Sequence, residues 1–204
     1  MIEKYKYNGK NLEEALNNCY EELNCNENNI YYIEKEIEAK LFKAKRIEIE
    51  VIKKEDVIIY LKNFIETISK YMNLEINYEI KEDENYFNIL LVSDNNALLI
   101  GKDGKNLNAL QIILRQAIKN IGNYNIKVSL DASNYRAKKI NNLEREIKKI
   151  AREVLKTKID AKLDPMNSYQ RRIIHKLISE YENLETESIG ETPNRYIIIK
   201  YVEK

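Results

Sequence analysis

The sequence has few of the residues from which metal sites and most catalytic centres are built. Its 204 residues include two cysteines and one histidine. Two cysteines are too few for a disulfide framework or a matched zinc site, and a lone histidine excludes a zinc cluster and most catalytic triads. Since no pair of carboxylates is clustered either, the sequence predicts no catalytic residue, no bound metal and no cofactor.

Long apolar runs are missing as well. No stretch approaches the roughly 20 apolar residues that a membrane helix needs, and the first five residues are not followed by the apolar run of a secretory signal. Hydrophobic residues make up 44% and charged residues 33%, which is typical of a folded chain rather than a disordered one. We therefore expect a cytoplasmic protein whose two thiols stay reduced.

The chain does have an uneven distribution of charge. The formal net charge is +1, but residues 1–94 carry 13 Lys/Arg against 20 Asp/Glu, and residues 95–204 carry 21 against 13. A polyanion responds to the local field rather than to the average over the chain. A single basic helix would more simply be a solvated face, but a whole basic half favours nucleic acid as a partner.

The N-terminal fifty residues are typical of a β-α-β-β unit. The expected strands cover residues 2–8, 30–37 and 46–52. A helix begins at Leu12, where Asn11 is the expected N-cap and Glu14 its reciprocal partner. A unit of this size buries too little surface to be very stable alone.

A second unit has the order α-β-β-α-α-β. Apolar residues at spacings of three and four predict its two long helices, and Gly122 is well placed to end the second of them. The expected elements are a helix at 56–72, strands at 75–81 and 86–93, a short apolar turn at 97–100, a helix at 105–121 and a strand at 125–130.

The third unit is basic. The expected elements are a helix at 133–157, a helix from Pro165 to about Tyr181, and strands at about 184–188 and 195–202. Residues 132–158 hold nine Lys/Arg against three Glu. The chain is thus expected to have an α+β fold with three small domains at 1–52, 53–131 and 132–204.

A short loop, Gly101-Lys102-Asp103-Gly104, leads into the helix that begins at Lys105. Glycines without Cβ atoms let a sugar-phosphate chain approach the backbone closely. The helix N-terminus offers free N–H groups and a positive dipole end to phosphate, and Lys102 and Lys105 add charge. A Walker loop is excluded, because it needs four residues between its glycines and a Ser/Thr after its lysine. Apolar side chains are expected to wall a groove for unpaired bases beside the loop: Leu99, Ile100, Leu107 and Leu110.

The segment around this loop resembles a type II KH domain. The likeness is carried by Leu98-Leu99-Ile100-Gly101-Lys102-Asp103-Gly104 and by Asn106-Leu107-Asn108-Ala109-Leu110-Gln111. In that family the loop clamps about four nucleotides of single-stranded RNA. The resemblance implies RNA-binding residues at Ile100, Gly101, Lys102, Asp103, Gly104 and Lys105. Asp103 stands where relatives often have a basic residue, which predicts a weaker hold on phosphate.

Arg171 and His175 are one helical turn apart, so both side chains emerge on one face. Alone, they would more simply be an exposed pair or a histidine at the edge of a core. Residues 165–175 and 186–196, however, resemble the domain named for its Arg-x-x-x-His signature, which binds single-stranded nucleic acid. The resemblance implies nucleic-acid contacts from Arg171, Arg172, His175 and Arg195, with Arg136 on the preceding basic helix.

A KH domain followed directly by such a domain is the arrangement of the Jag family, also called KhpB or EloR. Leu130-Asp131 and Tyr135-Arg136 match the start of the linking helix of that family, and the likeness covers about residues 56–204. The N-terminal unit resembles the small Jag N-terminal domain in element order and length. Residues 38–44 stand where the family carries an apolar knob between glycines, but both glycines are absent here, and so is the usual long acidic linker.

The resemblance implies a cytoplasmic RNA chaperone or post-transcriptional regulator linked to cell elongation and to homeostasis of the peptidoglycan envelope. It implies single-stranded RNA as the ligand and the small KH protein KhpA as a partner. Single-stranded DNA stays an alternative, because strands of either kind can lie in such a groove. Another function also stays open, in which the N-terminal domain docks on a membrane-associated cell-envelope protein and RNA binding is secondary. The sequence indicates no oligomeric state.

Overall fold

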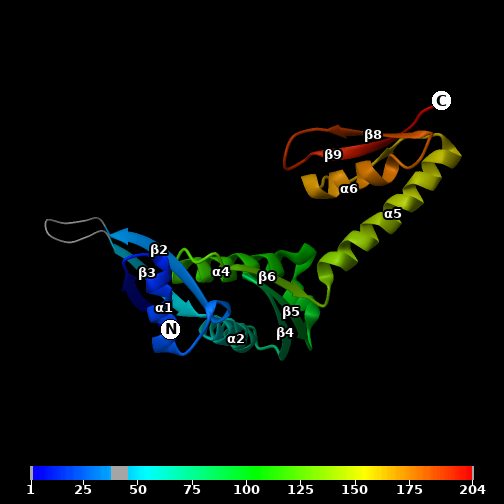
Figure 1. Ribbon diagram of the computed structural model, residues 1–204. Coiled ribbons are helices and arrows are strands. Elements are labelled where there is room, and N and C mark those ends of the chain that lie inside the picture. Colours follow the sequence, from blue (N-terminus) through cyan, green and yellow to red (C-terminus); the bar gives the residue numbers. More distant parts are fainter. Residues whose placement is uncertain (1, 38–45, 204) are drawn as a thin grey trace. The chain divides into compact units, whose positions relative to one another are not determined.

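The computed structural model describes residues 2–37 and 46–203. The chain divides into two compact units, one ending at Ser133 and one beginning at Asn134. Within the described residues there are three separate three-stranded sheets, with strand orders β1-β3-β2, β4-β5-β6 and β7-β9-β8 (Figure 1). The predicted α+β class with three small sheets is confirmed. None of the helices in this part of the chain is long and apolar enough to cross a membrane.

The first sheet contains β1 (Tyr5–Gly9), β2 (Ile30–Ile37) and β3 (Arg46–Lys53), and α1 (Leu12–Leu23) packs on one of its faces; a short 3-10 helix, η1 (Glu27–Asn29), precedes β2. The side chain of Asn11 accepts a hydrogen bond from the Glu14 amide at 2.8 Å, so the predicted N-cap is confirmed. The Glu14 carboxylate, however, accepts from the amide of Lys10 at 2.7 Å and not from that of Asn11, so the reciprocal bond is shifted by one residue. Cys19 is buried in this core, and its burial raises the pKa of the thiol to about 11. The expected knob at 38–44 lies outside the described residues.

The second sheet contains β4 (Ile76–Asp83), β5 (Tyr86–Ser93) and β6 (Lys127–Ala132), with β4 antiparallel and β6 parallel to β5. The helical elements are α2 (Lys54–Met72), α3 (Asn96–Ile100), the 3-10 turn η2 (Lys102–Gly104) and α4 (Lys105–Ile121). Alternate residues of β5 are buried, namely Phe87, Ile89, Leu91 and Ser93. One face of this sheet therefore carries the core, and α4 ends at Gly122, as predicted.

A buried glutamine joins α4 to the free edge of β6. The side-chain amide of Gln111 donates to the carbonyl of Val128 at 3.2 Å and accepts from the amide of Leu130 at 2.7 Å. A buried amide group is costly unless it is hydrogen-bonded, and here both of its ends are satisfied by the backbone. Gln111 thus fixes the distance between the helix that follows the glycine loop and the edge strand beside it.

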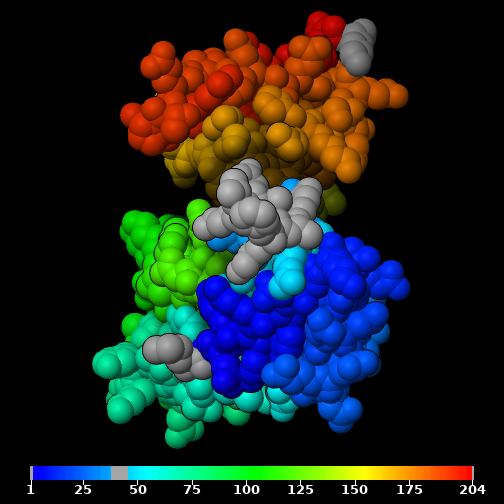
Figure 2. All heavy atoms as spheres, turned by 60° about the vertical axis from the view of Figure 1, so that its left-hand side comes forward, coloured from blue at the N-terminus to red at the C-terminus, as the bar shows by residue number. Residues whose placement is uncertain are grey.

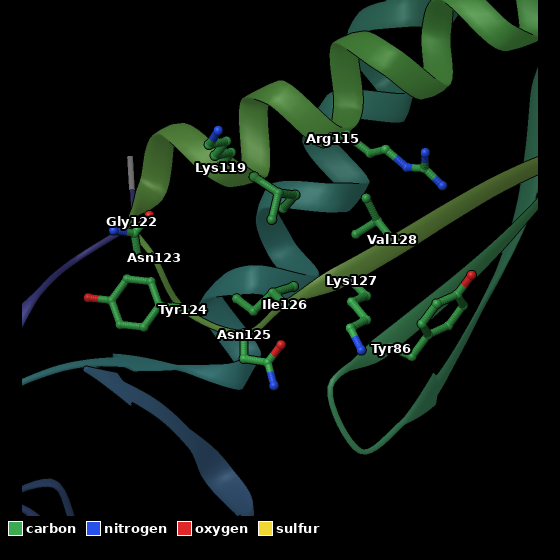
Figure 3. A pocket seen from close by; sticks show the side chains of 11 residues that line it. Tyr86, Arg115, Lys119, Gly122, Asn123, Tyr124, Asn125, Ile126, Lys127 and Val128 are labelled. Atoms are coloured by element: carbon green, nitrogen blue, oxygen red, sulfur yellow. The ribbon is translucent and has the colours of Figure 1, made fainter. Parts of the chain in front are cut away.

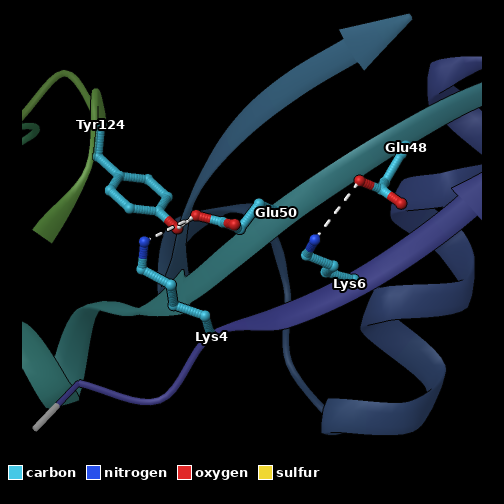
Figure 4. Close-up of polar contacts among 5 residues, drawn as sticks. All are labelled: Lys4, Lys6, Glu48, Glu50 and Tyr124. Atoms are coloured by element: carbon cyan, nitrogen blue, oxygen red, sulfur yellow. Dashed lines mark hydrogen bonds and ion pairs between the residues drawn. The ribbon is translucent and has the colours of Figure 1, made fainter. Parts of the chain in front are cut away.

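The first sheet is docked on the second within the same compact unit. The hydroxyl of Tyr124, which follows α4, donates to Glu50 on β3 at 2.9 Å, and the Lys4 ammonium lies 3.0 Å from the same carboxylate oxygen (Figure 4). The Lys4 ammonium also lies 5.8 Å from the centroid of the Tyr124 ring. In the space-filling view, the blue atoms of the N-terminal elements abut the cyan and green atoms of the residues that follow (Figure 2).

A second set of contacts holds the other end of this interface. The Tyr31 hydroxyl donates to the carbonyl of Glu84 at 3.1 Å, and its ring meets Phe87 edge-on, with centroids 6.5 Å apart. The Lys54 ammonium lies 3.3 Å from the carboxylate of Glu82. The first set joins β3 and the residue before β1 to the segment before β6. The second set joins β2 and the start of α2 to the β4–β5 hairpin. The first sheet is therefore fixed to the second domain at both places.

Removal of the Glu50 carboxylate should loosen this interface. We expect Glu50→Ala to lower the free energy of unfolding by about 2 kcal/mol, because the Tyr124 hydroxyl and Lys4 lose their shared acceptor. Glu48→Ala is the matched control, since Glu48 lies two residues away on the same face of β3 and forms an ion pair with Lys6 at 3.8 Å (Figure 4). It should cost about 0.5 kcal/mol or less. Urea unfolding of both variants checks this, and equal losses would contradict it.

The same interaction should depend on pH. Hydrogen bonds from Lys4 and then from Tyr124 hold the pKa of Glu50 below its ordinary value. The native state therefore binds this proton less readily than the unfolded chain. The contribution of the Glu50 carboxylate to the free energy of unfolding is present above the ordinary pKa of glutamate and is lost as the pH falls through the lowered native pKa.

The C-terminal unit begins with the long helix α5 (Tyr135–Thr157), followed by β7 (Ala161–Lys162), α6 (Ser168–Ile178), β8 (Leu184–Ile189) and β9 (Tyr196–Tyr201). One face of α5 packs against α6 and β9. The core contains residues of all three: Ile147, Ala151, Val154, Ile174, Leu177, Ile178, Ile197 and Ile199. The short strand β7 was not predicted, because two residues are too few to show a periodic pattern.

The predicted start of α6 at Pro165 is wrong. The helix begins at Ser168, where Asn167 and Gln170 form a reciprocal capping box. The preceding residues are hydrogen-bonded to β9 and to the residue before it, since the amides of Leu163 and Met166 donate to the carbonyls of Ile197 and Arg195. The hydrogen bonds to the β9 segment therefore prevent Pro165 from taking the first helical position, which proline otherwise favours.

Candidate nucleic-acid interface

The Gly101–Gly104 loop joins α3 to α4 through three residues in the left-handed region. The φ angles are +72° at Gly101, +58° at Asp103 and +84° at Gly104. Glycine adopts such angles without steric cost, and aspartate tolerates them better than most residues. The Gly104 amide donates to the Gly101 carbonyl at 3.1 Å, which closes the turn. The loop is therefore a defined backbone shape rather than an open segment.

Asn106 supports this shape, although sequence reasoning did not single it out. Its side-chain amide donates to the carbonyl of Leu98 at 2.8 Å, across the loop. A Cβ atom placed on Gly101 would lie 2.6 Å from Cγ of Asn106. Gly101 is thus required both by its φ angle and by the side chain packed against it.

The loop presents its positive groups to solvent. Lys102 and Lys105 are exposed, and among the described residues no side chain caps the N-terminus of α4. The amides of that first turn therefore remain available to an anion, and the helix dipole adds to the attraction. Asp103 is exposed between the two lysines, so one carboxylate lies within a site otherwise suited to phosphate.

The expected groove wall needs correction. Leu99 and Leu107 are 0% and 1% exposed and belong to the core, while Ile100 and Leu110 are half-buried. The apolar side chains that face solvent nearby in sequence are Leu98, Ile112 and Ile113, which are 46%, 67% and 55% exposed. The periodic pattern could not separate them, because both faces of the helices carry aliphatic residues. Any apolar contact with bases would come from this exposed set.

A cavity of about 560 Å³ lies at the opposite end of α4, where the chain turns into β6 (Figure 3). Three cations line it, namely Arg115, Lys119 and Lys127, together with the ring of Tyr86. None of its eleven lining residues is acidic, and among the described residues no carboxylate forms an ion pair with these cations. Sequence reasoning missed this site, because its residues come from three separate elements.

In the C-terminal unit, three of the predicted residues lie together. Arg171 on α6 donates to the carbonyl of Met166 at 2.8 Å, and Arg195, just before β9, donates to the hydroxyl of Ser188 at 3.0 Å. Nδ1 of His175 is hydrogen-bonded to the hydroxyl of Thr186 on β8. Arg171 lies one turn from His175 on α6. Thr186 and Ser188 are two residues apart on β8, so their side chains lie on one face of that strand and hold His175 and Arg195 on the same surface.

His175 should titrate below the ordinary range of histidine. Burial, and then the charges of Arg171 and Arg195, lower its pKa. The unfolded chain therefore binds this proton more readily, and the free energy of unfolding should decrease as the pH falls from the ordinary pKa toward the lowered one. Proton NMR of the only imidazole in the chain measures the native pKa directly. A native pKa at or above that of an unfolded peptide would contradict the expectation, and His175→Gln should lack this part of the pH dependence.

The predicted binding residues thus fall into two sets. Residues 100–105 form the glycine loop and its flanks in the first unit, and Arg171, His175 and Arg195 form one cluster in the second. Arg172 is exposed on α6 beside that cluster, and Arg136 is exposed in the first turn of α5. Thr186, Ser188 and the carbonyl of Met166 were not assigned a role from sequence, because no motif marks these pairings, which form only in the folded domain.

Comparison with known proteins agrees with this division. Residues 54–131 match the family described as KhpA/KhpB, KH domain, and residues 141–201 match the domain family named for the Arg-x-x-x-His signature. RNA-binding protein KhpB of Bacillus subtilis (strain 168) is 31% identical over 199 residues, which cover 95% of this chain and 96% of that protein. The chain belongs to the KhpB family. The predicted family is confirmed, and it is a family of RNA-binding proteins rather than of enzymes.

Other KhpB proteins match a shorter part of the chain. KhpB of Clostridium symbiosum is 38% identical over 138 residues, which cover 67% of this chain and 62% of that protein. KhpB of Streptococcus pneumoniae serotype 2 is 27% identical over 145 residues, which cover 71% of this chain and 44% of that protein. The match to the B. subtilis protein is the one of these three that includes nearly the whole chain.

Proposed function

We propose that this chain binds single-stranded RNA through two surfaces. One is the glycine loop of the KH domain with Lys102 and Lys105, and the other is the cluster of Arg171, His175 and Arg195 in the Arg-x-x-x-His domain. The observation that carries the proposal is the loop, whose left-handed glycines expose an uncapped helix N-terminus between two lysines. The KhpB proteins of B. subtilis and C. symbiosum are described as RNA-binding.

The cavity at the end of α4 would extend the KH surface. The glycine loop precedes α4 and the cavity lies at the other end of that helix, with Arg115 about 15 Å along the axis from Lys105. The cavity offers three cations and the Tyr86 ring to a nucleotide. Tyr124, which lines it, is held by Glu50 of the first sheet. The N-terminal unit would thus contribute to RNA binding by fixing one wall of the cavity.

The finer parts of the proposal follow the family. We propose domains at 1–52, 53–131 and 132–204, a partnership with the small KH protein KhpA, and action in the cytoplasm as an RNA chaperone or post-transcriptional regulator. The regulated process would be cell elongation and envelope homeostasis. Arg172 on α6 and Arg136 in the first turn of α5, both exposed, would add phosphate contacts.

Fluorescence anisotropy with labelled single-stranded RNA tests the proposal. The full chain should bind with an affinity that falls as salt rises, with a slope of about −0.7 for each phosphate contact. Single-stranded DNA of the same sequence should bind more weakly if the 2′-hydroxyl is read. If wild-type protein shows no saturable binding to RNA at low salt, the proposal is wrong.

A further inference from the structure

The outer face of α5 carries a row of positive charge that neither surface above uses. Its members are Lys138, Arg145, Lys149, Arg152 and Lys156, which we call the cationic stripe. Their spacings of seven, four, three and four place them on one side of a helix. All five are exposed, whereas the buried residues of α5 are Ile147, Ala151 and Val154 on the opposite side. The stripe therefore faces away from the core of the Arg-x-x-x-His domain.

The stripe costs the protein stability. Neighbours at spacings of three and four, such as Arg145 with Lys149 and Lys149 with Arg152, repel each other on the helix surface. Glu146 and Glu153 lie three or four positions from Lys149 or Lys156 and offset part of this repulsion, whereas Glu144 has no stripe residue at such a spacing. Within the described residues no ion pair joins a carboxylate to any of the five cations. This face of α5 therefore keeps an excess of positive charge, which is expected at a surface that binds a polyanion.

The geometry of the stripe suits phosphates rather than bases. Its side chains are cations on a convex helix, so they provide no ring on which an unpaired base could stack and no cavity to hold one. From Lys138 to Lys156 the stripe is about 27 Å long. A base-paired stem presents phosphates in a fixed array and at higher charge density than a flexible single strand, so it releases more counterions per contact.

We infer that the cationic stripe of α5 binds the phosphate backbone of a base-paired RNA stem. The inference rests on the proposed function, because the stem would belong to the same RNA whose unpaired segment lies on the two proposed surfaces. The chain then recognises a junction between a stem and a single strand. Linking the two contacts on one molecule raises affinity through effective concentration.

Three RNAs test this with the full chain: a single-stranded tail, the same tail joined to a stem at least as long as the stripe, and the stem alone. Wild-type protein should bind the stem-tail RNA about tenfold or more tightly than the tail. Arg145→Gln/Lys149→Gln/Arg152→Gln should lose this gain, reduce the salt slope on stem-tail RNA by about 2 to 3, and bind the tail as wild type does. Glutamine retains helix propensity, so α5 should persist and its melting temperature should rise slightly.

The matched control is Lys35→Gln/Lys62→Gln/Lys70→Gln, which removes the same charge from exposed positions of the other unit. It should keep the gain from the stem. The inference is overturned if the stem adds nothing for wild type, if both triple variants lose affinity equally, or if the stripe variant weakens tail and stem-tail binding by one factor. It is also overturned if the stripe variant loses only capture on anionic phosphatidylserine vesicles, since the stripe would then be a membrane surface. Failure of wild type to bind the tail, with stem binding intact, would instead contradict the proposed function.

Discussion

Gly101→Asp is expected to weaken binding of single-stranded RNA about a hundredfold, which corresponds to about 2.7 kcal/mol. The new Cβ would lie 2.6 Å from Cγ of Asn106, in a backbone conformation with φ of +72° that side chains disfavour. The loop must therefore shift, and the added carboxylate enters the space intended for phosphate. Anisotropy titration with a short oligonucleotide of about four nucleotides, the length that a KH loop holds, isolates this surface.

Three further substitutions separate the causes of this loss. Gly101→Ala introduces the clash without charge, and Lys102→Gln removes charge at an exposed position without a clash. Each should have part of the effect of Gly101→Asp. Asp103→Asn should act in the opposite direction and tighten binding about threefold at low salt, because asparagine tolerates the left-handed conformation and carries no negative charge. If Gly101→Asp folds normally and binds the short RNA like wild type, the loop is not the binding site.

The elements that follow from local chemistry were predictable. Strand β2 was expected at 30–37 and lies there, and α1 starts where the side chain of Asn11 accepts a hydrogen bond from the amide of Glu14. These features depend on neighbours within a few residues. By contrast, β6 was expected at 125–130 and covers Lys127–Ala132. Just before this strand, Tyr124 is hydrogen-bonded to Glu50, which lies 74 positions away in the sequence. A contact between residues so far apart leaves no local pattern from which the start of β6 could be predicted.

The candidate site divides in the same way. The glycine loop and the Arg171–His175 pair are contiguous motifs, so the sequence was enough to find them. The cavity lined by Tyr86, Arg115 and Lys127 depends on three elements whose meeting is a property of the fold. Likewise, the contact of His175 with Thr186 depends on how α6 packs on β8, and that of Arg195 with Ser188 on how β8 and β9 pair. Side-chain burial could not be predicted from the pattern either, since Leu99 and Leu107 were expected to wall the groove and are buried in the core.

A double substitution in the cluster of Arg171, His175 and Arg195 should show that the two surfaces act together. On an RNA long enough to reach both, Arg171→Ala/Arg195→Ala should weaken binding about a hundredfold, because linked weak sites can gain 10² or more through effective concentration. On the short oligonucleotide held by the KH loop, the same variant should bind like wild type. The effect therefore depends on RNA length, which a loss of overall charge would not produce.

The control for this experiment removes two other exposed cations of the same unit. Lys148→Ala/Lys176→Ala has the same change in charge, and neither lysine takes part in the hydrogen bonds that hold Arg171, His175 and Arg195 in place. It should weaken binding of the long, unstructured RNA only a few-fold.

The cluster variant must also be checked for folding by its unfolding midpoint, because Arg171 donates to the carbonyl of Met166. Arg195→Ala alone keeps this bond and offers a second variant. If the cluster variant and the control lose affinity equally on long RNA, the cluster adds only general charge. If the cluster variant loses affinity on short RNA as well, the two surfaces are not separate sites.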